Sequence, residues 1–156
     1  MLKNKLININ TNNDLISIGF IVKVGSKNET KKENGLSHFL EHMLFKGTKN
    51  YTTKKFLNKM DSLGLTYNAM TTHEYTFYEI HGHKKNWKKI TDILFELYLF
   101  PKFHSKDVEI ERGVILEEYN ITANDIDDYL YQNLFNNMYD DIHLQQAIIG
   151  TKKNLK

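Results

Sequence analysis

The sequence predicts a single domain that combines strands and helices. At 156 residues, the chain is long enough for one hydrophobic core, and 40% hydrophobic with 26% charged residues is typical of a globular protein. A stretch with period-two alternation precedes two segments with helical spacing, and a second β-forming stretch precedes three more helical segments. The predicted order is therefore β-α-α-β-α-α-α, without a linker or an internal repeat.

The first strand is predicted over residues 14–24, where apolar side chains alternate with small or polar ones. A polar, charged loop follows this strand. Asn34 is a plausible N-cap for the first helix, which we expect to run to a stop at Gly47.

The next helix is predicted to begin at Thr52 or Thr53 and to end at Gly64. Residues 65–83 return to strand character because aromatic and β-branched side chains are frequent there, and a turn near Thr72 can divide them.

Three further helices are expected in the second half of the chain. An amphipathic pattern over 87–100 ends at Pro101, which cannot continue a helix. Ser105 is a plausible cap for a long helix, and apolar residues recur at helical spacing over 126–138.

Composition excludes several functional classes. The net charge is only +2 and the lysines are spread among acidic residues, so we expect no nucleic-acid partner. No apolar run is long enough to span a bilayer, and the first ten residues lack the features of a signal peptide or presequence, so a cytoplasmic location without a membrane partner is expected. Cysteine is absent, which restricts any metal site to histidine and carboxylate ligands.

The motif His38-Phe-Leu-Glu41-His42 carries the clearest chemical signal. Two histidines four residues apart project from the same face of a helix and can reach one cation. Glu41 lies on the same side, where it can take a proton from water at the metal without being a ligand. This order is the inverse of the commoner H-E-x-x-H motif.

A catalytic zinc usually takes three protein ligands, so a third must come from elsewhere. Glu111 and Glu118 lie seven residues apart on one stripe of the long predicted helix, with Val114 and Ile115 between them. Glu117 points about 100° away from Glu118, given the 3.6-residue helical turn, and is expected to face solvent. The remaining histidines are interpreted as surface or structural residues.

These segments resemble a known family. Residues 35–48 resemble the active-site signature of the pitrilysin, insulinase and mitochondrial processing peptidase family. Residues 64–71 resemble the Asn-Ala strand of that family, and 111–118 resemble its second carboxylate segment. His143 with 149–151 is similar to a further signature downstream.

The resemblance assigns a role to each candidate residue. It implies that His38, His42 and Glu118 bind one Zn²⁺ ion per chain and that Glu41 is the general base of catalysis. It makes Glu111 a supporting acid that hydrogen-bonds near a ligand and tunes the site.

The resemblance also implies a substrate site. Asn68 and Ala69 would lie on an edge strand that pairs with an extended peptide substrate. Phe45 is a candidate wall of an apolar subsite, and a role in the core is equally compatible with its position. Leu65 stands where the family usually has a small residue, which would narrow the approach to this strand.

The fold implied by the resemblance is α+β, with a mainly antiparallel sheet and helices packed on one face. Residues 1–156 would form a single zinc-peptidase domain of the N-terminal type, truncated at its C-terminal end and so an incomplete copy of the family's first domain. Because the family builds its chamber from two related halves, we expect a second-half domain, a companion subunit or a homodimer as partner, besides the peptide substrate.

The predicted function is that of a zinc metalloendopeptidase, a hydrolase that uses a metal-activated water with Glu41 as general base. The alternative is a zinc-binding but non-hydrolytic domain that binds peptides or serves as a partner subunit. An intact Glu41 argues against this alternative, because a binding module has no need of a base, whereas the missing second half argues for it.

Overall fold

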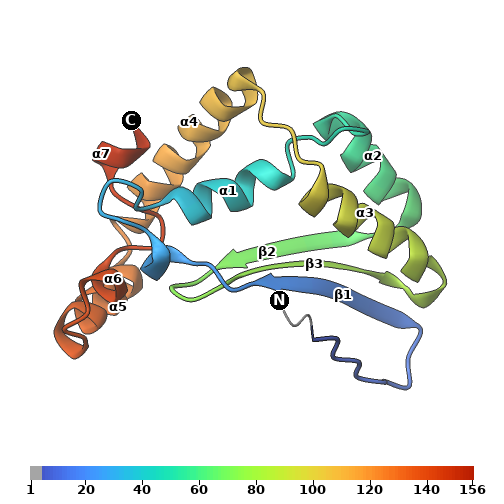
Figure 1. Ribbon diagram of the computed structural model, residues 1–156, viewed down its shortest axis with the longest axis horizontal. Helices are drawn as coiled ribbons and strands as arrows, with labels where there is room; N and C mark the ends of the chain where they lie inside the picture. The colour runs from blue at the N-terminus through green and yellow to red at the C-terminus, as the bar shows by residue number, and fades with distance from the viewer. Residues whose placement is uncertain (1–4) are drawn as a thin grey trace.

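The computed structural model of the chain describes residues 5–156 and shows a three-stranded sheet with helices above one of its faces (Figure 1). The α+β class, the antiparallel sheet and the one-sided helical layer are thus confirmed. The first ten residues are expected to lack a targeting signal, and four of them, residues 1–4, lie outside the described residues.

The sheet has the order β1-β3-β2, and both pairings are antiparallel. Its strands are β1 (Leu15–Val22), β2 (Thr66–Thr71) and β3 (Thr76–His83). Every second residue of β3 from Thr76 to Gly82 is buried, as befits the central strand beneath the helices. β1 repeats the predicted alternation in weaker form, with half-buried and exposed residues in turn.

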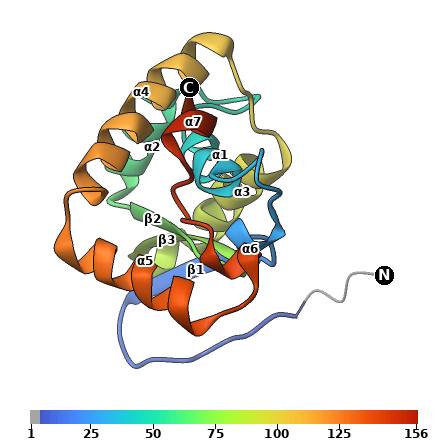
Figure 2. The same cartoon turned by 90° about the vertical axis from the view of Figure 1, so that its left-hand side faces the viewer.

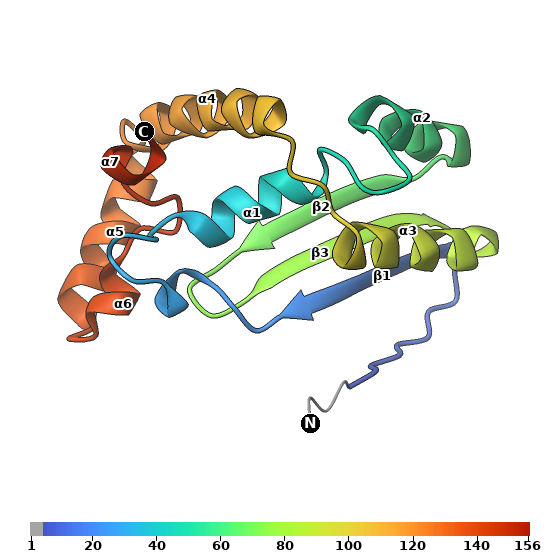
Figure 3. The ribbon, with the colours of Figure 1, turned by 45° about the horizontal axis from the view of Figure 1, so that its top comes forward.

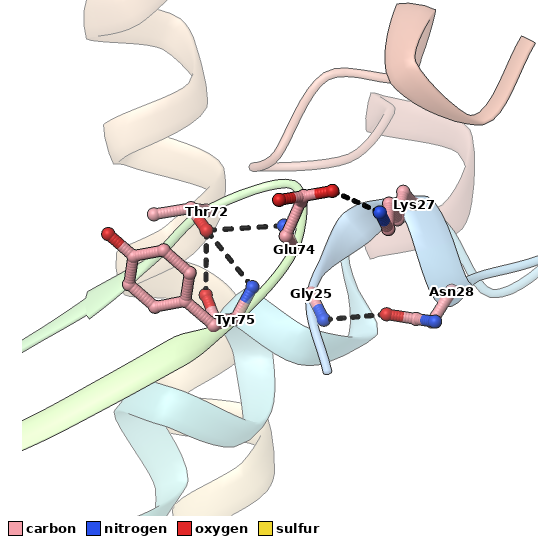
Figure 4. Close-up of polar contacts among 6 residues, drawn as sticks. All are labelled: Gly25, Lys27, Asn28, Thr72, Glu74 and Tyr75. Carbon is pink, nitrogen blue, oxygen red and sulfur yellow. Dashed lines mark hydrogen bonds and ion pairs between the residues drawn. The ribbon is translucent and has the colours of Figure 1, made fainter. Parts of the chain in front are cut away.

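The stretch 65–83 forms a hairpin, with its turn at the predicted position. The Thr72 hydroxyl accepts hydrogen bonds from the backbone N–H groups of Glu74, at 3.2 Å, and of Tyr75, at 3.0 Å (Figure 4). Because one threonine side chain holds both amides, the chain reverses within four residues, as in a turn stabilised by a hydroxyl.

Helices make up most of the remaining chain. Among the described residues the α-helices are α1 (Leu36–Leu44), α2 (Thr53–Leu63), α3 (Trp87–Leu99), α4 (Ser105–Thr122), α5 (Ile126–Met138), α6 (Ile142–Gln145) and α7 (Lys152–Leu155). Two short 3₁₀ helices, η1 (Ser26–Asn28) and η2 (Lys84–Asn86), precede α1 and α3. No helix in this part of the chain is both long and apolar enough to cross a membrane.

Helix α2 has the predicted ends. The Thr52 side chain accepts from the backbone N–H of Lys55, and Gly64 closes the helix in the left-handed region with φ of 60°. In α4 the cap position is one residue earlier than predicted, at His104, and Ser105 is the first helical residue.

Two predictions about α1 are wrong. Gly35, with φ of 99°, occupies the N-cap position instead of Asn34. The side chain of Asn34 is buried and donates to the carbonyl of Ala147 at 2.9 Å, so it is unavailable as a cap. The helix also ends at Leu44, three residues before Gly47.

The core lies between the sheet and helices α2 and α3, and α3 packs against β3 and β1. Its buried members are Phe56, Met60, Leu65, Ile80, Ile90, Ile93, Leu94 and Leu97. Leu65 packs over Gly82, where a Cβ atom would lie 2.2 Å from a Leu65 methyl carbon. This side chain therefore fills the core and does not narrow the approach to the edge strand.

Helices α5, α6 and α7 gather at the end of the sheet that carries the β2–β3 turn (Figures 1 and 2). Phe135 of α5 stacks on His73 in this turn, with ring centroids 4.6 Å apart. None of the residues of α5 is buried, whereas α3 buries four. Helix α5 therefore adds little to the core, whereas α7 packs on α4 and buries Leu155.

Candidate metal centre

Helix α1 crosses above the sheet and packs against α4, which lies on its far side from β1 (Figure 3). His38 and His42 are one turn apart on α1, and Glu118 faces them from α4. One ligand atom of each of these three residues lies within 4.8 Å of the other two. The structure therefore brings together the three side chains that the sequence suggested as a metal site.

Two distances within this cluster are close to those between ligand atoms of one zinc ion. His38 Nε2 lies 3.6 Å from Glu118 Oε1, and His42 Nε2 lies 3.5 Å from Glu118 Oε2. Two ligand atoms that are each bonded to a tetrahedral zinc at 2.0–2.2 Å are separated by about 3.4 Å. The donor set of two imidazoles and one carboxylate is also one that zinc enzymes use.

Burial keeps His38 in the protonation state that a ligand requires. Desolvation, with a smaller contribution from repulsion by His42, lowers the pKa of the His38 imidazole to about 4. The ring is therefore neutral at neutral pH, and a neutral imidazole is the metal-binding form.

His42 is held by a buried carboxylate on its other side. Its Nδ1 atom lies 2.9 Å from Oε1 of Glu111, whose side chain is only 3% exposed. A carboxylate can only accept, so Nδ1 carries the proton and the lone pair of Nε2 remains free for a metal. The Lys46 ammonium lies 2.6 Å from Oε2 of Glu111 and compensates its buried charge.

The Glu41 carboxylate reaches the end of strand β2. One of its carboxylate oxygens accepts a hydrogen bond from the Thr71 hydroxyl at the end of β2. Burial raises the pKa of Glu41, while the Thr71 hydroxyl and His42 oppose that rise. A raised carboxyl pKa makes the group a stronger base, which suits proton transfer near neutral pH.

The phase of α4 agrees with the sequence reasoning on its carboxylates. Glu111 is buried, Glu118 is half-buried and Glu117 is exposed. Ile115 is fully buried between the two inward carboxylates, but Val114 is 47% exposed and does not belong to the inward stripe.

Strand β2 has a partner on one side only within residues 5–156, so its other edge is open. Asn68 is opposite Glu79 and exposed, whereas Ala69 is opposite the buried Tyr78 and faces the helices. Phe45 lies beside this strand, with its ring 4.7 Å from the ring of Tyr67. Phe45 also packs on the core, so both readings of its position fit the geometry.

Two residues at the site had no role in the sequence reasoning. Lys46 lies inside the first family segment and Thr71 inside the second, so the motifs contained them without indicating their contacts. The signal that could have found Lys46 is charge balance, because a buried carboxylate at Glu111 requires a compensating cation. Nothing in the spacing of Thr71 indicates that it meets Glu41 across the domain.

A family model described as "Insulinase (Peptidase family M16)" matches residues 5–152 of this chain. The chain belongs to family M16. The recognition made from the sequence motifs is thereby confirmed.

Named proteins similar to this M16 chain include several peptidases. An uncharacterized zinc protease of Rickettsia felis is 37% identical over 142 residues, which are 91% of this chain and 34% of that protein. The β subunit of the human mitochondrial-processing peptidase is 31% identical and aligns with 90% of this chain and 29% of its own length. The chain thus spans about a third of the length of these relatives.

Solved structures of the family share the fold. A protease from Helicobacter pylori superposes with a TM-score of 0.85 at 29% identity, over 92% of this chain and 35% of that structure. The periplasmic protease PqqL of Escherichia coli gives a TM-score of 0.82 at 28% identity, over 91% of this chain and 16% of its own. The described residues therefore correspond to one part of larger M16 proteases.

Proposed function

We propose that this chain is the metal-bearing part of a zinc-dependent endopeptidase, with His38, His42 and Glu118 as the zinc ligands and Glu41 as the general base. The observation that carries the proposal is that three ligand atoms lie within 4.8 Å of one another beside the half-buried carboxylate of Glu41. The zinc proteases among the relatives support the choice of metal and of reaction.

Bound zinc supplies Lewis acidity, which lowers the pKa of water and polarises a carbonyl group. The chain's own residues supply the proton transfers. The Glu41 carboxylate accepts a proton from the attacking water and then passes it to the nitrogen of the leaving amine. The Thr71 hydroxyl orients this carboxylate, and burial raises its pKa toward the working range.

The open edge of β2 suits an extended peptide substrate. Backbone groups at Asn68 and Ala69 can pair with a substrate strand, which is a general mode of peptide recognition. Thr71 joins this strand to Glu41, so a peptide paired with β2 would pass close to the base. The aromatic pair Phe45 and Tyr67 would form the apolar wall beside it.

We further propose that catalysis needs a second structural half. Within residues 5–156 the outer edge of β2 has no partner strand, and correct alignment of reactants can lower a barrier by several kcal/mol. The partner would be a second-half domain, a companion subunit or a second copy of the chain. One relative is itself named as a subunit of a processing peptidase. A cytoplasmic location remains part of the proposal.

A second candidate function is a zinc-binding partner subunit without hydrolytic activity. It is favoured by one relative, 33% identical, that is named core protein I of the Euglena gracilis ubiquinol-cytochrome-c reductase complex. Against it stands Glu41, which a purely structural subunit would not need.

Turnover of internally quenched peptides by the zinc-loaded chain, alone and with candidate companion subunits, separates the two functions. We expect weak hydrolysis by the chain alone and stronger hydrolysis with the right companion, abolished by Glu41→Gln in both. A zinc-loaded chain that stays inactive with every companion would instead favour the partner-subunit function.

A further inference from the structure

The segment from Gly25 to Gly35, here called the 25–35 segment, connects β1 to α1. It contacts the turn of the β2–β3 hairpin and the first turn of α1. At its first end it is bonded to the turn of the β2–β3 hairpin. The backbone N–H of Ser26 donates to the carbonyl of Thr72 at 3.1 Å, and that of Lys27 donates to the carbonyl of His73 at 2.9 Å. Figure 4 shows the ion pair between Lys27 and Glu74 that joins the same two loops.

At its other end the segment holds the first turn of α1 through Glu29. Oε1 of Glu29 accepts from the backbone N–H of Ser37 at 2.6 Å, and Oε2 accepts from that of Gly35 at 2.8 Å. The Asn34 side chain donates to the same Oε2 at 3.3 Å. Glu29 thus caps the helix from six residues upstream, in the place of the missing side-chain N-cap.

Glu29 is only 5% exposed, so its charge is removed from water. A buried carboxylate is costly unless donors satisfy it, and here two backbone amides and one side-chain amide do so. The helix N-terminus, which carries partial positive charge, adds a favourable interaction. These terms fix both the position and the rotation of the first turn of α1.

The C-terminal part of the chain braces Glu29 from behind. The Glu29 carbonyl accepts from the ring of His143 at 3.1 Å and from the side chain of Gln146 at 3.2 Å. Gly35 lies against Ile149 and Gly150 there, because a Cβ atom on Gly35 would be 2.8 Å from the Ile149 carbonyl oxygen and 3.0 Å from the Cα of Gly150. The start of α1 therefore has little room to shift.

We propose that Glu29 is a positioning residue for the metal centre, which holds the first turn of α1 so that His38 and His42 meet Glu118 on α4. This inference rests on the proposed zinc site. His38 is one residue beyond Ser37, whose amide Glu29 binds, so a loosened first turn displaces this ligand directly. Glu118 belongs to another helix and would not follow that movement.

The variant Glu29→Gln tests the proposal. An amide group at either oxygen position would bring an NH₂ group against a backbone N–H, so the cap cannot be kept in full. The matched control is Glu33→Gln in the same segment, since the Glu33 carboxylate is exposed and bonds only locally to Thr30 within the described residues.

Two readouts are needed on the full chain, at a temperature where circular dichroism shows each variant to be folded. The first is the zinc Kd from competition with a chromophoric chelator, and the second is the visible absorption spectrum of the Co²⁺-loaded protein, which reports ligand geometry. We expect the Kd of Glu29→Gln to rise about tenfold or more, with an altered cobalt spectrum. Glu33→Gln should keep both values of the wild type.

A folded Glu29→Gln protein with wild-type zinc affinity and cobalt spectrum would overturn the inference. If that variant does not fold, Glu29→Asp keeps the charge on a shorter side chain and is expected to weaken zinc binding to a smaller extent. An unchanged Kd in Glu29→Asp would then overturn the inference. A wild-type chain that binds no zinc would overturn the proposed function and this inference with it, whereas unchanged variants beside a zinc-binding wild type contradict this inference alone.

Discussion

Two carboxylates of α4, Glu111 and Glu118, face helix α1, but they differ in exposure and in the partners around them. The side chain of Glu111 is 3% exposed and already has a cation, Lys46 at 2.6 Å, and a ring N–H from His42. That of Glu118 is 40% exposed, and its oxygens lie 3.6 Å from Nε2 of His38 and 3.5 Å from Nε2 of His42. These distances are too long for hydrogen bonds.

This difference separates a supporting carboxylate from a ligand. The protein itself satisfies Glu111, which is therefore part of the folded framework whether or not metal is bound. Glu118 faces the Nε2 atoms of His38 and His42 across a gap that a cation of the size of zinc would fill. We therefore expect loss of Glu118 to act on metal binding, and loss of Glu111 to act mainly on folding.

The largest expected effect is loss of metal from Glu118→Ala. Removing one of three ligands should leave less than about half an equivalent of zinc after dialysis, where the wild type keeps about one. Metal analysis by inductively coupled plasma spectrometry measures this, and His42→Ala should behave in the same way. Wild-type zinc content in both variants would refute the assigned ligand set.

Next in size is the effect of Glu41→Gln on hydrolysis. The amide keeps the shape of the side chain but cannot accept a proton, so kcat should fall by about 100-fold to 10,000-fold. Zinc content should remain that of the wild type. A variant that loses its zinc would identify Glu41 as a ligand and would remove it as the base.

The free energy of unfolding of the zinc-free protein should distinguish Glu111 from Glu118. Glu111→Ala leaves Lys46 and the His42 ring without their acceptor and should lower the free energy of unfolding by about 1–3 kcal/mol. Glu118→Ala should change it by less than about 0.5 kcal/mol, because its side chain is partly exposed. Urea unfolding of both variants in chelator tests this, and equal losses would erase the distinction.

The smallest effect is expected for Glu117→Gln, adjacent to Glu118 but exposed. Zinc content should match the wild type, and stability should change by less than about 0.5 kcal/mol. A marked loss of zinc in this variant would mean that the side chain of Glu117 reaches the site in solution.

Local patterns predicted the parts of the fold that depend on local chemistry. Thr52 and Gly64 bound α2 as expected, because a threonine cap and a left-handed glycine are determined by their immediate neighbours. The start of α1 could not be predicted in this way. Asn34 is drawn away by the carbonyl of Ala147, which is 113 residues distant in the sequence, and Glu29 takes over the capping.

In the candidate site, too, local spacing predicted some features, and contacts between distant elements determine the others. Helical spacing alone placed His38 and His42 on one face, and the phase of α4 separated Glu118 from Glu117. The contacts that support these residues join separate elements: Lys46 with Glu111, Thr71 with Glu41, and Glu29 with α1. Only the folded arrangement of the helices and the hairpin brings such partners together.

In the proposed site a zinc ion lies between α1 and α4 at Glu118 and not at Glu111. An anomalous difference map from crystals of the zinc-loaded protein, collected on both sides of the zinc absorption edge, would locate the ion. We expect one strong peak about 2.0–2.2 Å from His38 Nε2, His42 Nε2 and a Glu118 oxygen. A peak that has Glu111 as a ligand, or that lies away from His38 and His42, would contradict this expectation.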